Sequence, residues 1–202
     1  MALATSERAN NATQPTNNNI GAVPSTVPGG LTALEYGDGI QHRTVLNFGP
    51  GFYVTVGNTT GISFGSQQIY TFPQGRILVE GVLALFSQIA FNAQAGGAGT
   101  IAEAGSGDYS IGSTATADGT LNSTDVDLLP SSAMLDPFVA GLGSSAAGTA
   151  LAAAAQFDGT SAAKAAYLNV IVDDADVSDA ASGQKVYFVG SVQITWKWLG
   201  DY

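Results

Sequence analysis

The stretch VYFVGSVQITWKWLGDY, residues 186–202, decides the fold class of this chain. Every second residue from Val186 to Trp198 belongs to one predominantly apolar face, and this period of two is typical of a half-buried β-strand. The predicted inner face consists of Val186, Phe188, Gly190, Val192, Ile194, Trp196 and Trp198. We therefore expect Phe188, Trp196 and Trp198 to fill the core or a seam between subunits.

Shorter runs with the same pattern precede this strand. Residues 40–48 and 52–57 alternate, whereas the run from Arg76 to Phe91 is apolar on both faces, as expected for a covered central strand. Turns rich in glycine, proline and aspartate separate these runs at intervals of roughly 8 to 12 residues. The sequence predicts an all-β fold for residues 39–202, an antiparallel β-sandwich that is jelly-roll-like.

The alanine-rich segment from Ala150 to Phe157 supports two interpretations. Helix propensity favours a helix, because alanine is the best helix former. Asp158-Gly159 follows directly and is a strong hairpin signal, and the strand-like YLNVIVDD comes next. We favour a hairpin of two strands, and the helix stays open. A single helical turn is also expected after Asp136, with Pro137 at its first position.

Residues 1–38 differ in composition from the rest. They are rich in Asn, Thr, Pro and Gly and show no periodicity, which predicts an extended N-terminal arm. Such an arm is ordered only when a neighbouring subunit, a second protein or its own domain holds it. The candidate contacts with a second protein or another subunit are Asn17, Asn18, Asn19, Ile20, Val23, Pro24, Val27 and Leu31.

Charge and composition exclude several classes of partner. Charged residues make up only 11% of the chain, and the net charge of −10 argues against direct binding of nucleic acid or of an anionic membrane. The apolar run from Arg76 to Phe91 is too short and too polar to span a bilayer. The chain contains no cysteine, so it has neither disulfides nor thiolate metal sites.

The residues that could carry chemistry are few. His42 is the single histidine, and no nucleophile motif accompanies it. The acidic run Asp173, Asp174, Asp176 and Asp179 lacks the glycine and the final glutamate of a helical calcium loop. It is either a solvated turn between two strands, which we favour, or a looser calcium site in a loop. We predict no catalytic residue, no metal and no cofactor; an enzyme would need His42 or this acidic run at the floor of a pocket.

The closing pair AYLNVIVDDADV and GSVQITWKWLGDY resembles the C-terminal hairpin of tailed-bacteriophage capsid decoration (cement) proteins. The resemblance implies a jelly-roll domain, a homotrimer, and a place on the outer capsid surface after synthesis in the bacterial host cytoplasm. It also implies a structural role, in which the major capsid protein is the partner and neighbouring capsid subunits are bridged. The alternative is a phage tail or fibre-associated module, or a carbohydrate-binding β-sandwich, which exposed aromatic residues lining a groove would favour.

Overall fold

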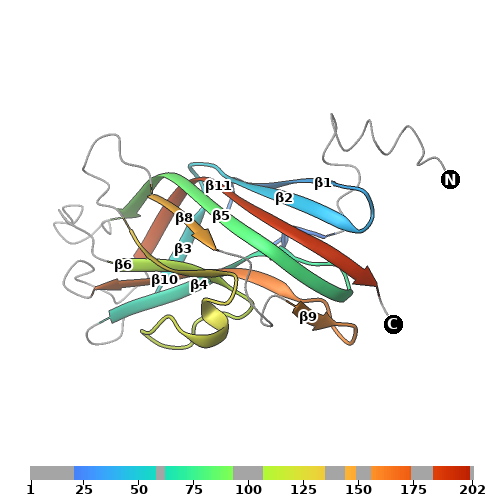
Figure 1. The fold of residues 1–202 in the computed structure, drawn as a ribbon. Coiled ribbons are helices and arrows are strands. Elements are labelled where there is room, and N and C mark those ends of the chain that lie inside the picture. The colour runs from blue at the N-terminus through green and yellow to red at the C-terminus, as the bar shows by residue number, and fades with distance from the viewer. Residues whose placement is uncertain are drawn as a thin grey trace.

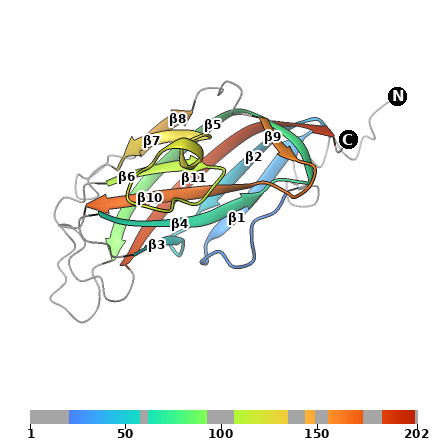
Figure 2. The same ribbon diagram turned by 90° about the horizontal axis from the view of Figure 1, so that it is seen from below.

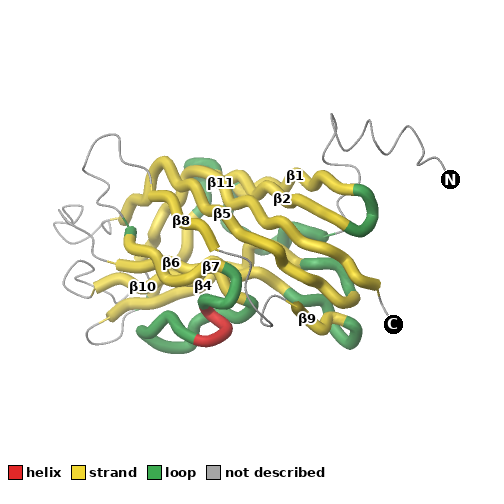
Figure 3. The backbone as a smooth tube through the Cα atoms, in the orientation of Figure 1, coloured by secondary structure: helices red, strands yellow, loops and turns green. Residues whose placement is uncertain are grey.

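The computed structural model describes residues 21–57, 62–92, 107–134, 144–148, 156–173 and 184–200, and these residues form strands and one short 3-10 turn, η1 (Ser123–Asp125) (Figures 1 and 3). The strands are β1 (Leu31–Gly37), β2 (Gln41–Phe48), β3 (Tyr53–Val56), β4 (Ile62–Thr71), β5 (Gly75–Asn92), β6 (Gly107–Gly112), β7 (Leu129–Ala133), β8 (Ser144–Gly148), β9 (Gln156–Gly159), β10 (Ala165–Asp173) and β11 (Gln184–Gly200).

The strands form two antiparallel sheets that pack face to face (Figures 1 and 2). The larger sheet has the order β1-β2-β11-β5-β8, with β3 beside β11 and β9 beside β5, and the smaller sheet has the order β4-β10-β6-β7. Eight strands alternate between the two sheets along the chain, except that β6 and β7 are consecutive in the smaller sheet. These strands are β2, β4, β5, β6, β7, β8, β10 and β11. This interleaving is the jelly-roll arrangement, and it confirms the predicted all-β antiparallel sandwich.

The long strands β5 and β11 run side by side through the centre of the larger sheet. Their register shifts between Val189 and Gly190, where the backbone of Gly190 has φ +149°. A Cβ at this position would lie 2.2 Å from the carbonyl oxygen of Leu85. The bulge therefore requires glycine at residue 190.

Side chains from the inner faces of both sheets fill a largely aromatic core. One end of the sandwich holds edge-to-face rings from both sheets: Phe48, Phe52, Phe86, Tyr109 and Phe188. The other end holds Tyr70, Phe72, Phe157 and Trp196. Both long strands contribute to this core, because alternate residues of each point inward.

The expected hairpin at Asp158-Gly159 is wrong. β9 pairs with β5 in the larger sheet, whereas β10 pairs with β4 and β6 in the smaller one. The Asp158 carboxylate accepts hydrogen bonds from the Thr160 amide and hydroxyl, and this turn directs the chain across the core instead of back on itself. Burial of the Phe157 side chain fixes β9 on the larger sheet. Residues 150–155 and the helical turn expected after Asp136 lie outside the described residues.

The closing pair is not a hairpin either, because β10 and β11 belong to different sheets. The feature that suggested the resemblance to decoration proteins is therefore a crossover between sheets. Two consecutive strands that read as a hairpin from the sequence can be placed opposite each other when each finds a better neighbour elsewhere.

The strand β1 lies inside the segment that was predicted to be an arm. It forms a hairpin with β2, and the Asp38 carboxylate accepts hydrogen bonds from the amides of Ile40 and Gln41 in the turn. These two bonds hold the pKa of Asp38 below its usual value. Residues 1–20 lie outside the described part of the chain.

Candidate functional site

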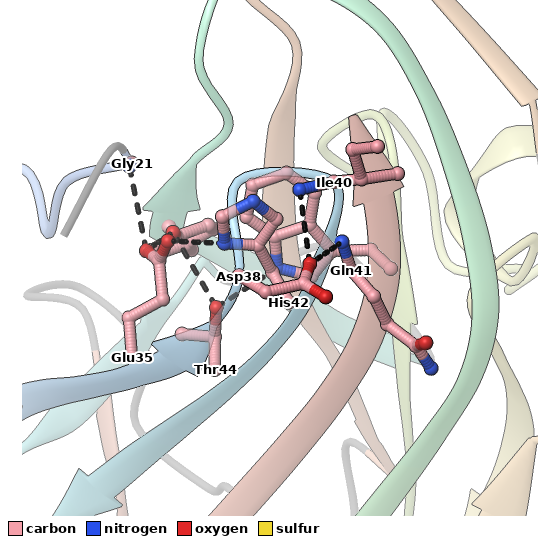
Figure 4. A network of polar contacts seen from close by, with 9 residues as sticks. Gly21, Glu35, Asp38, Ile40, Gln41, His42 and Thr44 are labelled. Carbon is pink, nitrogen blue, oxygen red and sulfur yellow. Dashed lines mark hydrogen bonds and ion pairs between the residues drawn. The ribbon is translucent and has the colours of Figure 1, made fainter. Parts of the chain in front are cut away.

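A buried polar network lies between the two sheets at the end where the described chain begins (Figure 4). Glu35 on β1 and His42 on β2 point toward each other, with 2.9 Å between Oε1 and Nδ1. Tyr70 on β4 donates its hydroxyl hydrogen to Glu35 Oε2 at 2.6 Å. Burial and the neighbouring carboxyl group of Glu35 raise the pKa of Tyr70 far above its usual value, so the phenol stays protonated.

Trp196 extends the network into the core. Its indole N–H donates to the Thr44 hydroxyl oxygen at 2.9 Å, and the Thr44 hydroxyl donates to Tyr70 at 3.4 Å. The ring of His42 stacks on Trp196 with 4.3 Å between centroids. His42 Nε2 is buried and has no hydrogen-bond partner among the described residues. The network thus joins three strands of the larger sheet to β4 of the smaller one.

The first described residues are attached to this network, and we call Gly21 and Ala22 the arm root. The Gly21 amide donates to Glu35 Oε2 at 3.4 Å, and Ala22 exchanges two backbone hydrogen bonds with Thr71, at 2.9 and 2.7 Å. A Cβ on Gly21 would lie 2.0 Å from the Tyr70 hydroxyl oxygen. Only glycine lets the backbone approach Tyr70 this closely.

The outer face of the larger sheet is a second candidate site, of a different kind. Along each strand of the larger sheet, residues that point into the core alternate with residues that point away from it. The residues that point away from the core form the outer face. Its centre is formed by the cross-strand rows Leu34–Val45–Gln193–Leu83 and Thr32–Asn47–Ser191–Leu85. None of these eight side chains carries a charge, and Leu85 is 47% exposed. Sheet faces with this composition can bind through area rather than through single charged contacts.

Basic residues lie at the two ends of this neutral centre. At one end the Lys185 ammonium lies 4.2 Å from the centre of the Tyr53 ring, and at the other the Arg43 guanidinium lies 5.0 Å from that of Tyr36. Lys197 lies on β11 near Arg43, two residues beyond the residue opposite Arg43, and it forms an ion pair with Glu80. The outer face is thus more basic than a chain of net charge −10 would suggest.

The smaller sheet carries acidic residues and a cluster of hydrogen bonds around the buried Asn169, which we call the polar knot. Asn169 on β10 is fully buried; its amide nitrogen donates to the carbonyls of Thr114 and Asp125, and its oxygen accepts from Ser66 and Thr116. These bonds fix the segment that follows β6.

Asp127 lies in that segment and accepts two hydrogen bonds from Ser113, at 2.7 and 2.6 Å. Burial nevertheless raises the pKa of Asp127 above its usual value.

The predicted contact residues divide into two groups. Asn17, Asn18, Asn19 and Ile20 lie outside the described residues, as do residues 174–179 of the acidic run. Val23, Val27 and Leu31 are partly buried and pack against the chain's own core, and Pro24 lies half-buried beside them. Binding of a partner by these residues stays a prediction. Among the described residues, no three His, Asp or Glu side chains lie together as metal ligands would.

The aromatic residues of the last strand lie in and beside the core. Phe188 and Trp196 are fully buried, whereas Trp198 is partly buried and donates its indole N–H to the Gln74 carbonyl. Sequence reasoning missed Glu35 and Tyr70. A signal for Glu35 existed, because the alternation in LTALEYG puts it on the same face as Leu31 and Ala33. A carboxyl group on an inner face needs a partner, and His42 lies just across the turn.

No helix in the described part of the chain is long and apolar enough to cross a membrane. The chain matches no protein-family model, no curated protein and no solved structure.

Proposed function

We propose that the chain is a structural virion protein that binds the outside of a phage capsid and stabilises it by bridging neighbouring major capsid subunits. The observation that carries this proposal is the arm root. Gly21 and Ala22 are fixed to both sheets by the Glu35–Tyr70 network, so the preceding residues start from a defined point on the sandwich. A segment of 20 residues that starts from a fixed point can reach a neighbouring subunit.

The composition supports a role in binding rather than in catalysis. Of the residues that an enzyme would need, His42 is only 5% exposed and is paired with the buried Glu35, and residues 174–179 of the acidic run lie outside the described residues. Homotrimeric subunits repeated on a lattice would make many weak contacts effective through multivalency. The jelly roll itself does not choose the function, since capsid proteins, lectins and cupins share it.

The test is a deletion of residues 1–20, which leaves the arm root and β1 intact. A deletion to residue 38 would remove Glu35 and one edge strand, and would confuse loss of fold with loss of binding. Heads of the encoding phage, purified without the protein, are incubated with the full chain or with the deletion variant and then sedimented. Full-length protein should be retained and should raise the temperature at which the heads release DNA.

The deletion variant should unfold at the same urea concentration as the full chain but be retained at least about tenfold less at equal concentration. Equal retention and equal heat stability of the heads would show that the arm does not clamp. Absence of binding by the full chain would overturn the proposed function itself.

The carbohydrate-binding alternative gains little support from the described rings. Trp196 is fully buried, and Lys185 covers one face of Tyr53 on the outer sheet face. A sugar would need an uncovered aromatic platform. We therefore carry forward the capsid-binding proposal alone.

A further inference from the structure

We infer that the outer face of the larger sheet docks on a flat, acidic protein surface. This inference rests on the proposed function and adds the chemistry of the partner: the capsid surface beneath the protein would present carboxylates around a neutral patch. Four observations support it, namely the size of the face, its neutral centre, the position of its basic residues and the charge of the rest of the chain.

The face is large enough for a specific interface. The stretch of β11 from Lys185 to Lys197 spans about 40 Å at ~3.3 Å per residue. β5 runs beside β11 over this whole length, whereas β2 and β1 flank only its Lys197 half and β3 flanks its Lys185 end. At a strand spacing of ~4.8 Å these strands cover roughly 700 Å2, which is close to the ~800 Å2 that each partner contributes to a standard interface.

The distribution of charge over the face matches the anatomy of an interface, in which a neutral centre is surrounded by a polar rim. The two central rows contain only apolar and uncharged polar side chains, with Leu85 the most exposed of its large apolar residues. Arg43 and Lys185 flank these rows, and within the described part of the chain neither makes an ion pair. Their charges are available to a partner's carboxylates.

Acidic residues gather elsewhere on the molecule. Asp108, Asp118, Asp125 and Asp127 lie on β6 or in the segment between β6 and β7. Among the described residues, the strand register places two acidic groups on the outer face: Glu80, which pairs with Lys197, and Asp158, which lies beside Arg76. The acidic parts of this chain would repel an acidic partner. The basic residues of the outer face would therefore orient the chain so that this face meets the partner.

A second copy of the chain fits the face less well. Two copies that pack outer face to outer face, parallel or antiparallel, bring basic ends together, because both ends carry a cation. Like charges at a rim oppose such a pair. An acidic surface on another protein has no such conflict, and it is the occupant we propose.

The experiment measures the binding of full-length protein to heads purified without it, at 50 mM and at 1 M salt. The double variant Arg43→Gln/Lys185→Gln should bind about tenfold more weakly than wild type at 50 mM salt, and this difference should shrink to within about twofold at 1 M salt. The charge-conserving double variant Arg43→Lys/Lys185→Arg and the single variant Lys164→Gln, which lies outside the face, should bind like wild type. Thermal unfolding checks that all variants fold.

A second pair of variants tests the neutral centre independently of the rim. Leu85→Asp places a carboxylate in the centre of the face and should reduce binding more than tenfold. Ile62→Asp is the matched control, since Ile62 is 40% exposed but lies on β4 in the other sheet, and it should bind like wild type.

The outcomes separate the two proposals. Binding by wild type that is unaffected by Arg43→Gln/Lys185→Gln and by Leu85→Asp would overturn the acidic-partner inference and leave the proposed function standing. Failure of wild type to bind would overturn both. Oligomers of the free protein that dissociate in the Leu85→Asp variant would identify the face as a contact between copies and would also overturn the inference.

Discussion

Replacing Gly21 with alanine should detach the arm root. The new Cβ would lie 2.0 Å from the Tyr70 hydroxyl oxygen and 2.6 Å from the Thr71 carbonyl oxygen, whereas ordinary contacts of this kind are 3.4 Å or longer. Tyr70 is fully buried and bonded to Glu35, so the mobile partner is the arm root. Moving it breaks the two backbone hydrogen bonds between Ala22 and Thr71, and also the longer bond of 3.4 Å from the Gly21 amide to Glu35, which adds little.

The expected cost follows from these bonds. Each of the two short Ala22–Thr71 bonds contributes about 1 kcal/mol, so Gly21→Ala should lower the free energy of unfolding by about 2 kcal/mol. Gly29→Ala is the matched control, because a Cβ at residue 29 meets nothing within 4 Å. Restricting the unfolded chain at such a position stabilises a protein by about 0.4–1 kcal/mol, so the two substitutions should differ in sign.

Urea denaturation followed by tryptophan fluorescence is a suitable assay, because Trp196 belongs to the same network. Equal midpoints for Gly21→Ala and wild type would refute the reasoning, since the close approach of Gly21 to Tyr70 would then not exist in solution. A loss well above 2 kcal/mol would mean that Tyr70 moves instead and that the Glu35 bond is broken as well.

Three further predictions concern the rest of the sandwich. Asn169→Ala removes four buried hydrogen bonds and should cost about 3 kcal/mol in urea unfolding, and a cost below 1 kcal/mol would contradict the polar knot. Ser63→Ala should be neutral or stabilising by up to about 1 kcal/mol, because the buried Ser63 hydroxyl has no hydrogen-bond partner among the described residues, whereas Ser110→Ala loses a bond of 2.7 Å to a carbonyl and should destabilise. Burial raises the pKa of Asp127, so the stability of wild type relative to Asp127→Asn should be greatest below about pH 4 and fall as the pH rises through the folded-state pKa; a difference that grows with pH would contradict this assignment.

The sequence was sufficient to predict the class of fold and the inner face of the last strand. Strand periodicity depends on the chain's own alternation, so Val186, Phe188 and Trp196 could be assigned to the core without knowing their neighbours. The pairing of strands could not be predicted in the same way. Asp158-Gly159 is a genuine local turn, but the burial of Phe157 against the opposite sheet decides where the chain goes next.

The network at the arm root was missed because the first 38 residues were judged by composition. Asn, Thr, Pro and Gly dominate this segment as a whole, and they conceal the alternation of LTALEYG at its end. Tyr70 carried no signal at all, since its contact with Glu35 joins residues 35 positions apart in different sheets. Contacts of this kind depend on how the sheets stack, and local patterns do not contain that information.

The position of β11 has a consequence for how the chain acquires its structure during synthesis. β11 follows all the other described strands in the sequence, yet it lies between β2 and β5 and pairs with both. Until the ribosome releases its residues, β1 and β2 cannot join the β5 half of the larger sheet, and the core stays open along its centre. The sandwich should therefore close only after β11 has been synthesised, with the slow folding typical of non-local pairing, and products truncated before β11 should expose the core and be degraded.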